Sequence, residues 1–226
     1  MIKLLQPLRH IVQAVFVAGL FLPILPAADV IGEKIWLTAI FIGVFFCGWC
    51  CPFGTAQEWI GMVARQLHVP RFRPSPAVQQ YLQISRYFLY GLSALGITFF
   101  FLNARYYFDH NLVMNMLNWF SGGTLAVFLL FAIFVDRPFC NYFCLKGAAD
   151  GMLSTVRPLS IARLEERCIH CHLCDKNCPM HILVEQSKFV RHPNCINCFK
   201  CISVCPKNCL KYKPFGFFKQ KNKGEK

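Results

Sequence analysis

Long apolar blocks separated by short polar segments occupy the first 135 residues of the chain, and the residues that follow are polar and basic. A helix needs roughly 20 apolar residues to cross the hydrocarbon core of a membrane. The pattern therefore predicts an α-helical membrane domain with four transmembrane helices, arranged as two pseudo-repeated hairpins, followed by a small soluble domain. The predicted spans are residues 11–30, 35–51, 85–102 and 112–135.

Basic residues flank these segments unevenly. Four arginines lie in or near the loop between the second and third segments, whereas Lys34 and Arg105 are the basic residues of the two opposite loops. The positive-inside rule then predicts that the N-terminus, the loop 52–84 and the C-terminal half are cytoplasmic. A cleaved signal peptide is the alternative for the first segment, because Lys3 and Arg9 precede it and PAA at 26–28 resembles a cleavage site.

Two cysteine runs in the polar half share the spacing C-x2-C-x2-C-x3-C-P, at residues 168–179 and 195–206. Three cysteines two residues apart can wrap three corners of a cubane 4Fe–4S cluster. In two-cluster ferredoxins the fourth cysteine of each run binds the other cluster. The iron ligands predicted for cluster 1 are Cys168, Cys171, Cys174 and Cys205, and those for cluster 2 are Cys195, Cys198, Cys201 and Cys178.

Other interpretations of these cysteines are weaker. Zinc sites use C-x2-C pairs, but they do not usually add a third cysteine two residues on and a fourth before proline, twice. Structural disulfides are unexpected on the reducing cytoplasmic side. The four nearby histidines are expected at the surface, and Cys209 is expected to be a free thiol. These histidines are His170, His172, His181 and His192.

A short internal repeat lies outside the ferredoxin runs. FCGWCCPFGTA at 46–56 aligns without gaps with FCNYFCLKGAA at 139–149, so that a C-x3-C motif occurs twice. On a pseudo-twofold axis the four thiols can converge and hold a third 4Fe–4S cluster at the membrane edge. Metal-free thiols, or separate roles for the two motifs, stay open. The four cysteines are Cys47, Cys51, Cys140 and Cys144, and Cys50 has no counterpart.

The formal charge of the 226-residue chain is +13, and 16 of its 24 lysines and arginines lie at or beyond Arg137. Such a charge suits an anionic lipid surface or an acidic redox partner. We expect no nucleic-acid partner, since no motif of that kind is present. The predicted organisation is a membrane domain at 1–157, a two-cluster α+β ferredoxin domain at 158–213 and a basic tail at 214–226.

Together, the apolar segments, the sequence CGWCCP, the second C-x3-C motif and the two ferredoxin runs resemble the membrane-bound NapH/NosR-type polyferredoxins. One departure is Leu145, where the family usually has proline. The resemblance implies a bacterial inner-membrane protein that relays electrons between the quinone pool, or other redox subunits, and its clusters. It would then be an electron-transfer subunit of an oxidoreductase of the quinol dehydrogenase kind, with quinone as a candidate cofactor.

Two other functions are compatible with the same motifs. One is a maturation factor that reduces the metal centre of a partner enzyme, and the other is a membrane redox sensor. The motifs assign no catalytic residue, and they leave the direction of electron flow and the roles of Cys50 and Cys209 open.

Overall fold

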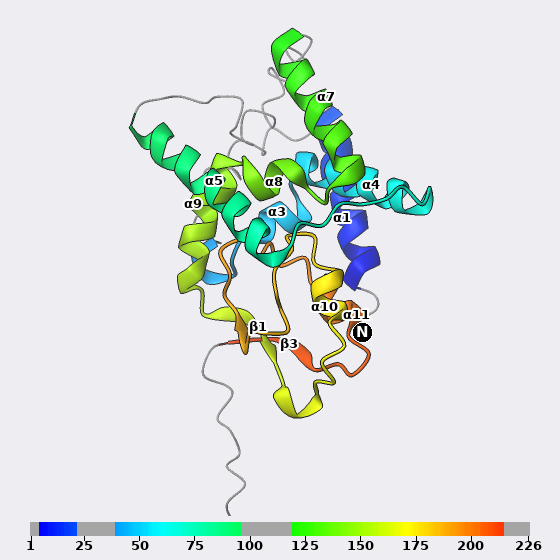
Figure 1. Cartoon of the computed structure of the whole chain (residues 1–226), viewed down its shortest axis with the longest axis vertical. Helices are drawn as coiled ribbons and strands as arrows, with labels where there is room; N and C mark the ends of the chain where they lie inside the picture. The colour runs from blue at the N-terminus through cyan, green and yellow to red at the C-terminus, as the bar shows by residue number, and fades with distance from the viewer. Residues whose placement is uncertain (1–4, 22–38, 96–118, 215–226) are drawn as a thin grey trace, which may run out of the picture.

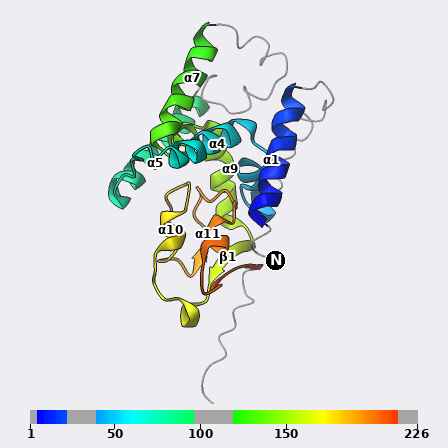
Figure 2. The ribbon, with the colours of Figure 1, turned by 90° about the vertical axis from the view of Figure 1, so that its right-hand side faces the viewer.

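The computed structural model describes residues 5–21, 39–95 and 119–214, which form a layer of helices above a ferredoxin-like unit (Figures 1 and 2). The helical layer contains α1 (Leu5–Phe21), α3 (Phe45–Trp49), α4 (Pro52–Gln66), α5 (Pro76–Ala94), α7 (Trp119–Phe134), α8 (Pro138–Tyr142) and α9 (Leu145–Leu153). The ferredoxin-like unit contains β1 (Leu159–Arg163), α10 (Leu173–Lys176), β2 (Phe189–Val190), α11 (Lys200–Val204) and β3 (Leu210–Pro214).

The prediction of four membrane-spanning helices is wrong for the described residues. No helix among them is both long enough and apolar enough to cross a membrane. The predicted spans also continue into residues 22–38 and 96–118, which lie outside the described part of the chain. The predicted small α+β unit, by contrast, is present.

Helix α5 shows one physical reason for this correction. It begins at Pro76, nine residues before the predicted third span, and its buried face carries polar side chains. Gln83 Nε2 donates to the carbonyl oxygen of Met180 at 2.9 Å, and Arg86 Nη1 donates to that of Cys140 at 3.1 Å. A buried amide and guanidinium need such partners, so this face of α5 packs on protein rather than on lipid.

The predicted second span is broken at Gly43. Helical residues end at 41, Gly43 has a φ of +92°, and α3 begins at Phe45. A Cβ at Gly43 would lie 2.5 Å from Arg157 Nη1 and 2.8 Å from Asn197 Nδ2. Glycine tolerates both the positive φ and the close approach. The break therefore lets this segment pack against residues of the ferredoxin-like unit.

One sheet and one core tie the two layers together. Strand β1 is central and antiparallel to both neighbours, with Ile161 opposite Val190 and Tyr212. Trp49 of the helical layer is buried in the same apolar cluster as Ile161, Val190 and Met180. Side chains from the predicted membrane domain, 1–157, and from the predicted ferredoxin domain, 158–213, thus share one core. The predicted domain boundaries stay a prediction, and residues 215–226 of the tail lie outside the described residues.

Candidate metal centres

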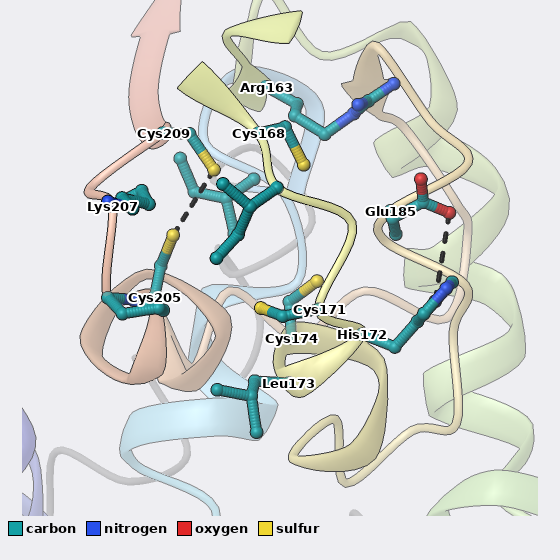
Figure 3. A pocket seen from close by; sticks show the side chains of 13 residues that line it. Arg163, Cys168, Cys171, His172, Leu173, Cys174, Glu185, Cys205, Lys207 and Cys209 are labelled. Carbon is teal, nitrogen blue, oxygen red and sulfur yellow. Dashed lines mark hydrogen bonds and ion pairs between the residues drawn. The ribbon is translucent and has the colours of Figure 1, made fainter.

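The first cavity, which we name cavity 1, is lined mainly by cysteines and by side chains around them (Figure 3). Its thiols come from the loop before and along α10 and from the segment that follows α11. Cys171 is exposed, whereas Cys209 is buried. All four cysteines predicted for cluster 1 line it, together with one more; the five are Cys168, Cys171, Cys174, Cys205 and Cys209.

The second cavity, named cavity 2, has apolar walls that include Met180, Ile182 and Val190. The four cysteines predicted for cluster 2 line it, and all four are buried: Cys178, Cys195, Cys198 and Cys201. Burial raises the pKa of Cys178 to about 12. Without metal the thiol of Cys178 would be protonated, whereas iron binds the thiolate form.

The two cysteine runs adopt the same loop conformation. Residues at matching places in each run have a positive φ, in the left-handed region. The pairs are His170 with Asn197, His172 with Phe199, and His181 with Asn208, all with φ between 47° and 56°. This repeated left-handed geometry coils each loop around its own cavity.

The spacing of the sulfur atoms suits a cluster rather than one zinc ion. Zinc holds its sulfurs at about 2.3 Å, so four zinc-bound sulfurs lie close to one another. Among the described residues, no three cysteines bring their sulfurs within 4.8 Å of one another. Four more widely spaced thiols around one cavity fit the corners of a cubane cluster. When bound, such a cluster supplies a one-electron redox centre.

The C-x3-C repeat has the same local structure in both copies. Cys51 precedes α4 with φ −63° and ψ 110°, and Cys144 precedes α9 with φ −63° and ψ 109°. The sulfur of Cys51 accepts a hydrogen bond from Gly54 N at 3.4 Å, and that of Cys144 accepts one from Gly147 N at 3.3 Å. Each sulfur thus faces the backbone amides of the first turn of the following helix.

The structure brings the four cysteines of this repeat together, and we name them the C-x3-C centre. Burial raises the pKa of Cys47 well above its usual value, and negative charge on Cys51 and Cys144 raises it further. Burial also raises the pKa of Cys51, and charge on Cys140 adds to it. Cys51 and Cys144 are buried in one apolar cluster, and Cys140 packs against it. These three thiols are also the ones whose charges act on Cys47.

Positive charge surrounds the C-x3-C centre and is only partly balanced. Glu58 on α4 accepts hydrogen bonds from Arg9 and Arg137, and Lys200 Nζ lies 2.9 Å from it. Arg137 also donates to the carbonyl oxygen of Cys47 at 2.8 Å. One buried carboxylate therefore faces three cations, and the excess positive charge would stabilise an anionic group nearby.

A fully buried arginine lies on the other side of this centre. Among the described residues, Arg86 donates to neutral groups: the carbonyl oxygen of Cys140, Tyr87 Oη and Asn194 Oδ1. A buried guanidinium without a counter-charge is costly. Four thiolates carrying a cluster would supply that charge beside Cys140.

The C-x3-C centre docks directly on the loop of cavity 2. Trp49 Nε1 donates to the carbonyl oxygen of Asn197 at 3.0 Å. Gln6 Nε2 donates to that of Cys198 at 2.9 Å. A Cβ at Gly48 would overlap with the carbonyl oxygen of Ile196, so this approach requires glycine. The predicted centres at the C-x3-C motifs and in cavity 2 are therefore neighbours.

Sequence reasoning missed the residues that build this junction. Glu58, Arg86 and Arg137 are buried polar residues that link distant segments, and Gly48 is a contact glycine. The only signal was a carboxylate within the amphipathic stretch that follows CGWCCP. Cys50 is half-buried, packs against the core around cavity 2, and has its pKa raised to about 11 by burial.

Two of the predicted surface histidines lie at the mouth of cavity 1. His172 Nδ1 is 3.2 Å from Asp175 Oδ2, and His170 contacts Glu185. Asp175 Oδ1 also accepts hydrogen bonds from the backbone amides of Val184 and Glu185, so this group braces the loop. His181 and His192 do not line either cavity.

Two family models match the chain. The model described as "4Fe-4S binding domain" matches residues 35–70 and 117–157, which contain both C-x3-C motifs. The model described as "4Fe-4S dicluster domain" matches residues 160–206, which contain both ferredoxin runs. The chain therefore binds 4Fe–4S clusters, while the assignment of each cysteine to one cluster stays a prediction.

Three curated proteins illustrate the similarity. The "Putative electron transport protein YccM" of Escherichia coli is 35% identical over 71% of the chain and 48% of its own length. The "Regulatory protein NosR" of Pseudomonas aeruginosa is 30% identical over 61% and 20%. The "Ferredoxin-type protein NapH" of Escherichia coli is 24% identical over 71% and 58%. The chain thus matches about half the length of YccM, and no solved structure matches it significantly.

Proposed function

We propose, because the chain belongs to the NapH/NosR-type 4Fe–4S polyferredoxins, that it relays electrons between the quinone pool or another redox partner and its clusters within a respiratory chain. Membership of this family directly supports iron–sulfur electron transfer. The route through the C-x3-C centre, the quinone and the membrane location are the proposal.

The observation that carries the route is the docking of helices α1 and α3 on the loop of cavity 2. Backbone carbonyls of that loop accept hydrogen bonds from Gln6, Arg9 and Trp49. Trp49 lies two residues after Cys47 and is buried in the core that surrounds Cys195, Cys198 and Cys201. These contacts hold the C-x3-C centre and cavity 2 against each other, as a relay between adjacent carriers requires.

The charges around the C-x3-C centre support a third cluster there. Arg86 and Arg137 are 2% and 1% exposed, and each donates to a backbone carbonyl of a C-x3-C cysteine. Arg137 is paired with Glu58, but protonated thiols would leave Arg86 without a counter-charge, whereas a cluster with four thiolates is anionic. The same arginines would stabilise the more negative, reduced form of that group.

A location at the bacterial cytoplasmic membrane is part of the proposal. Helices α1, α5 and α7 expose large apolar side chains, among them Ile11, Phe88 and Leu130, which are 60–65% exposed. These helices lie on the side of the molecule away from the sheet (Figures 1 and 2). Exposed apolar surface of this kind suits contact with lipid, and the basic ferredoxin-like unit would then face the cytoplasm, with both termini.

Iron counting tests the proposed third cluster. Anaerobically purified full-length protein should contain about twelve irons per chain, and Cys47→Ser should contain about eight. Cys50→Ser is the matched control, because it removes a neighbouring thiol without a counterpart in the repeat, and it should leave the count unchanged. A wild-type count near eight that Cys47→Ser does not lower would contradict the third cluster.

Reduction kinetics test the relay itself. In membrane vesicles, a quinol should reduce the ferredoxin clusters of the wild type, as followed by EPR. In Cys47→Ser the quinol should fail to do so, while dithionite should still reduce them directly. Quinol-dependent reduction at the wild-type rate in this variant would refute the route through the C-x3-C centre.

A further inference from the structure

Cavity 1 contains one thiol more than a cubane cluster binds. Cys209 lines the cavity with the four predicted ligands and is 4% exposed. Its sulfur lies 3.2 Å from that of Cys205, and Figure 3 shows the two side chains pointing toward each other. Two thiols therefore converge on a single corner of the site.

The first ferredoxin run shows that packing does not require a cysteine at this place. CPMHI at 178–182 and CPKNC at 205–209 are equivalent, since His181 and Asn208 both have a positive φ, of 53° and 50°. Cys209 thus occupies the place of Ile182, which is 5% exposed and lines cavity 2. This part of the wall is therefore an apolar side chain, Ile182, in cavity 2 and a thiol, that of Cys209, in cavity 1.

The backbone holds Cys209 firmly in position. Its carbonyl oxygen accepts a hydrogen bond from Leu164 N at 2.8 Å, and the next residue, Leu210, pairs with Arg163 in the sheet. Cys205, in contrast, precedes the exposed residues Pro206 and Lys207. The thiol of Cys209 is therefore fixed beside a neighbour that lies at the edge of an exposed segment.

We propose that Cys209 is a second thiol donor for the iron that Cys205 binds in cluster 1. Each iron of a cubane cluster takes one protein thiolate, so one of the two cysteines is bound at a time. In the exchange a sulfur–iron bond forms at Cys209 while the bond at Cys205 breaks, and the thiol proton moves from Cys209 to the departing sulfur of Cys205. No electron is gained or lost in this step.

The repeat supplies a matched experiment. Cys205→Ala removes a ligand whose corner has a reserve thiol, and Cys178→Ala removes the equivalent ligand of cluster 2, which has Ile182 beside it. Iron, acid-labile sulfide and EPR spectra are measured anaerobically on the full chain. Cys205→Ala should keep the wild-type iron content, whereas Cys178→Ala should lose one to four irons per chain, depending on whether a three-iron cluster survives.

Three further variants fix the interpretation. Cys205→Ala combined with Cys209→Ile should lose iron as Cys178→Ala does, and Cys209→Ile alone should lose none. The proposal is overturned if Cys205→Ala alone loses as much iron as Cys178→Ala, or if Cys209→Ile alone loses iron, since Cys209 would then be the resident ligand.

The inference rests on the assignment of cluster 1 to cavity 1, and Cys168→Ala tests that assignment separately. An unchanged iron content in Cys168→Ala would reject the assignment itself.

Discussion

The two ferredoxin cavities share a cysteine spacing and a loop conformation, but they differ in what covers them. In cavity 2 all four predicted ligands are buried. In cavity 1 Cys171 is exposed and Cys168, Cys174 and Cys205 are half-buried. Helices α1 and α3 contribute to this difference, because Gln6, Arg9 and Trp49 donate hydrogen bonds to the loop of cavity 2 and so cover it.

Within the proposed relay, this difference gives each of the two sites its own position. A buried site between two others suits an internal carrier, whereas a site with an exposed ligand suits exchange with a soluble partner. The loop of cavity 2 also receives hydrogen bonds from Arg9 and Arg157, while the mouth of cavity 1 carries Asp175 and Glu185 beside Arg163. Donors and positive charge raise a cluster potential, so these contacts favour the higher potential for cluster 2.

The largest expected difference between the two cavities is the rate at which a chelator removes their iron. An iron chelator, added under anaerobic conditions to the oxidised protein, should release about four irons from cavity 1 before it affects cavity 2. The physical reason is access, because Cys171 is exposed and the cysteines of cavity 2 are not. EPR of samples reduced at each time point would show which cluster has gone. Release of iron from both sites at one rate would remove the distinction.

Glu58→Gln should cause the largest loss of stability, because it leaves Arg9, Arg137 and Lys200 without a buried carboxylate. Removing one partner of a buried ion network costs about 3–5 kcal/mol of unfolding free energy. Anaerobic chemical denaturation measures it. Glu165→Gln is the matched control, since the side chain of Glu165 is exposed next to Arg163, and its effect should be within about 0.5 kcal/mol. Equal effects of the two substitutions would contradict the role of the network.

The same carboxylate predicts an acid-sensitive junction. Burial alone would raise the pKa of Glu58, but Arg137, Lys200 and Arg9 hold it well below its usual range. A folded-state pKa below the unfolded one gives stability that is complete above about pH 4.5 and is lost as the pH falls further. Unfolding measured between pH 7 and pH 3 should show this decline in the wild type. A decline just as steep in Glu58→Gln would assign it to other groups.

Gly48→Ala should weaken the contact between α3 and the loop of cavity 2. The loss of unfolding free energy should be smaller than in Glu58→Gln. The added methyl group would overlap with the carbonyl oxygen of Ile196, which cannot move aside as a side chain can. Overpacking of this kind costs about 1–3 kcal/mol. Gly91→Ala is the control, because nothing lies within 4 Å of a Cβ there and alanine favours its helix by up to about 1 kcal/mol. Denaturation should show a loss of stability in Gly48→Ala and none in the control, and the EPR spectrum of cluster 2 should change only in Gly48→Ala.

The sequence was informative where the chemistry depends on local spacing. The two cysteine runs identify eight of the nine thiols that line the two cavities, all but Cys209, because a cluster-binding loop is built from residues only two or three positions apart. The C-x3-C repeat likewise identifies Cys47, Cys51, Cys140 and Cys144 as a group, since each copy ends one short helix and begins the next.

The helical layer was harder to predict because hydropathy averages over a segment. Residues 85–102 look apolar as a whole, yet the helix that enters them begins at Pro76 and buries Gln79, Gln83 and Arg86. The partner of Gln83 is the carbonyl oxygen of Met180, 97 positions away. A window of about twenty residues cannot detect such a partner, so the pattern predicted a span where the described structure has a protein-packed helix.

Trp49→Phe should give the smallest change and test the junction most locally. It removes the hydrogen bond from Nε1 to the carbonyl oxygen of Asn197 and keeps an aromatic ring stacked on Phe45. The loss of one buried hydrogen bond costs about 0.5–1.5 kcal/mol. Trp59→Phe, at a half-buried tryptophan of α4, is the control for ring size. Because Asn197 lies between Cys195 and Cys198, Trp49→Phe should shift the EPR spectrum of cluster 2 and leave that of cluster 1 unchanged. A shift of both spectra would mean that the junction acts on the ferredoxin-like unit as a whole, and a shift of neither would mean that the tryptophan only packs.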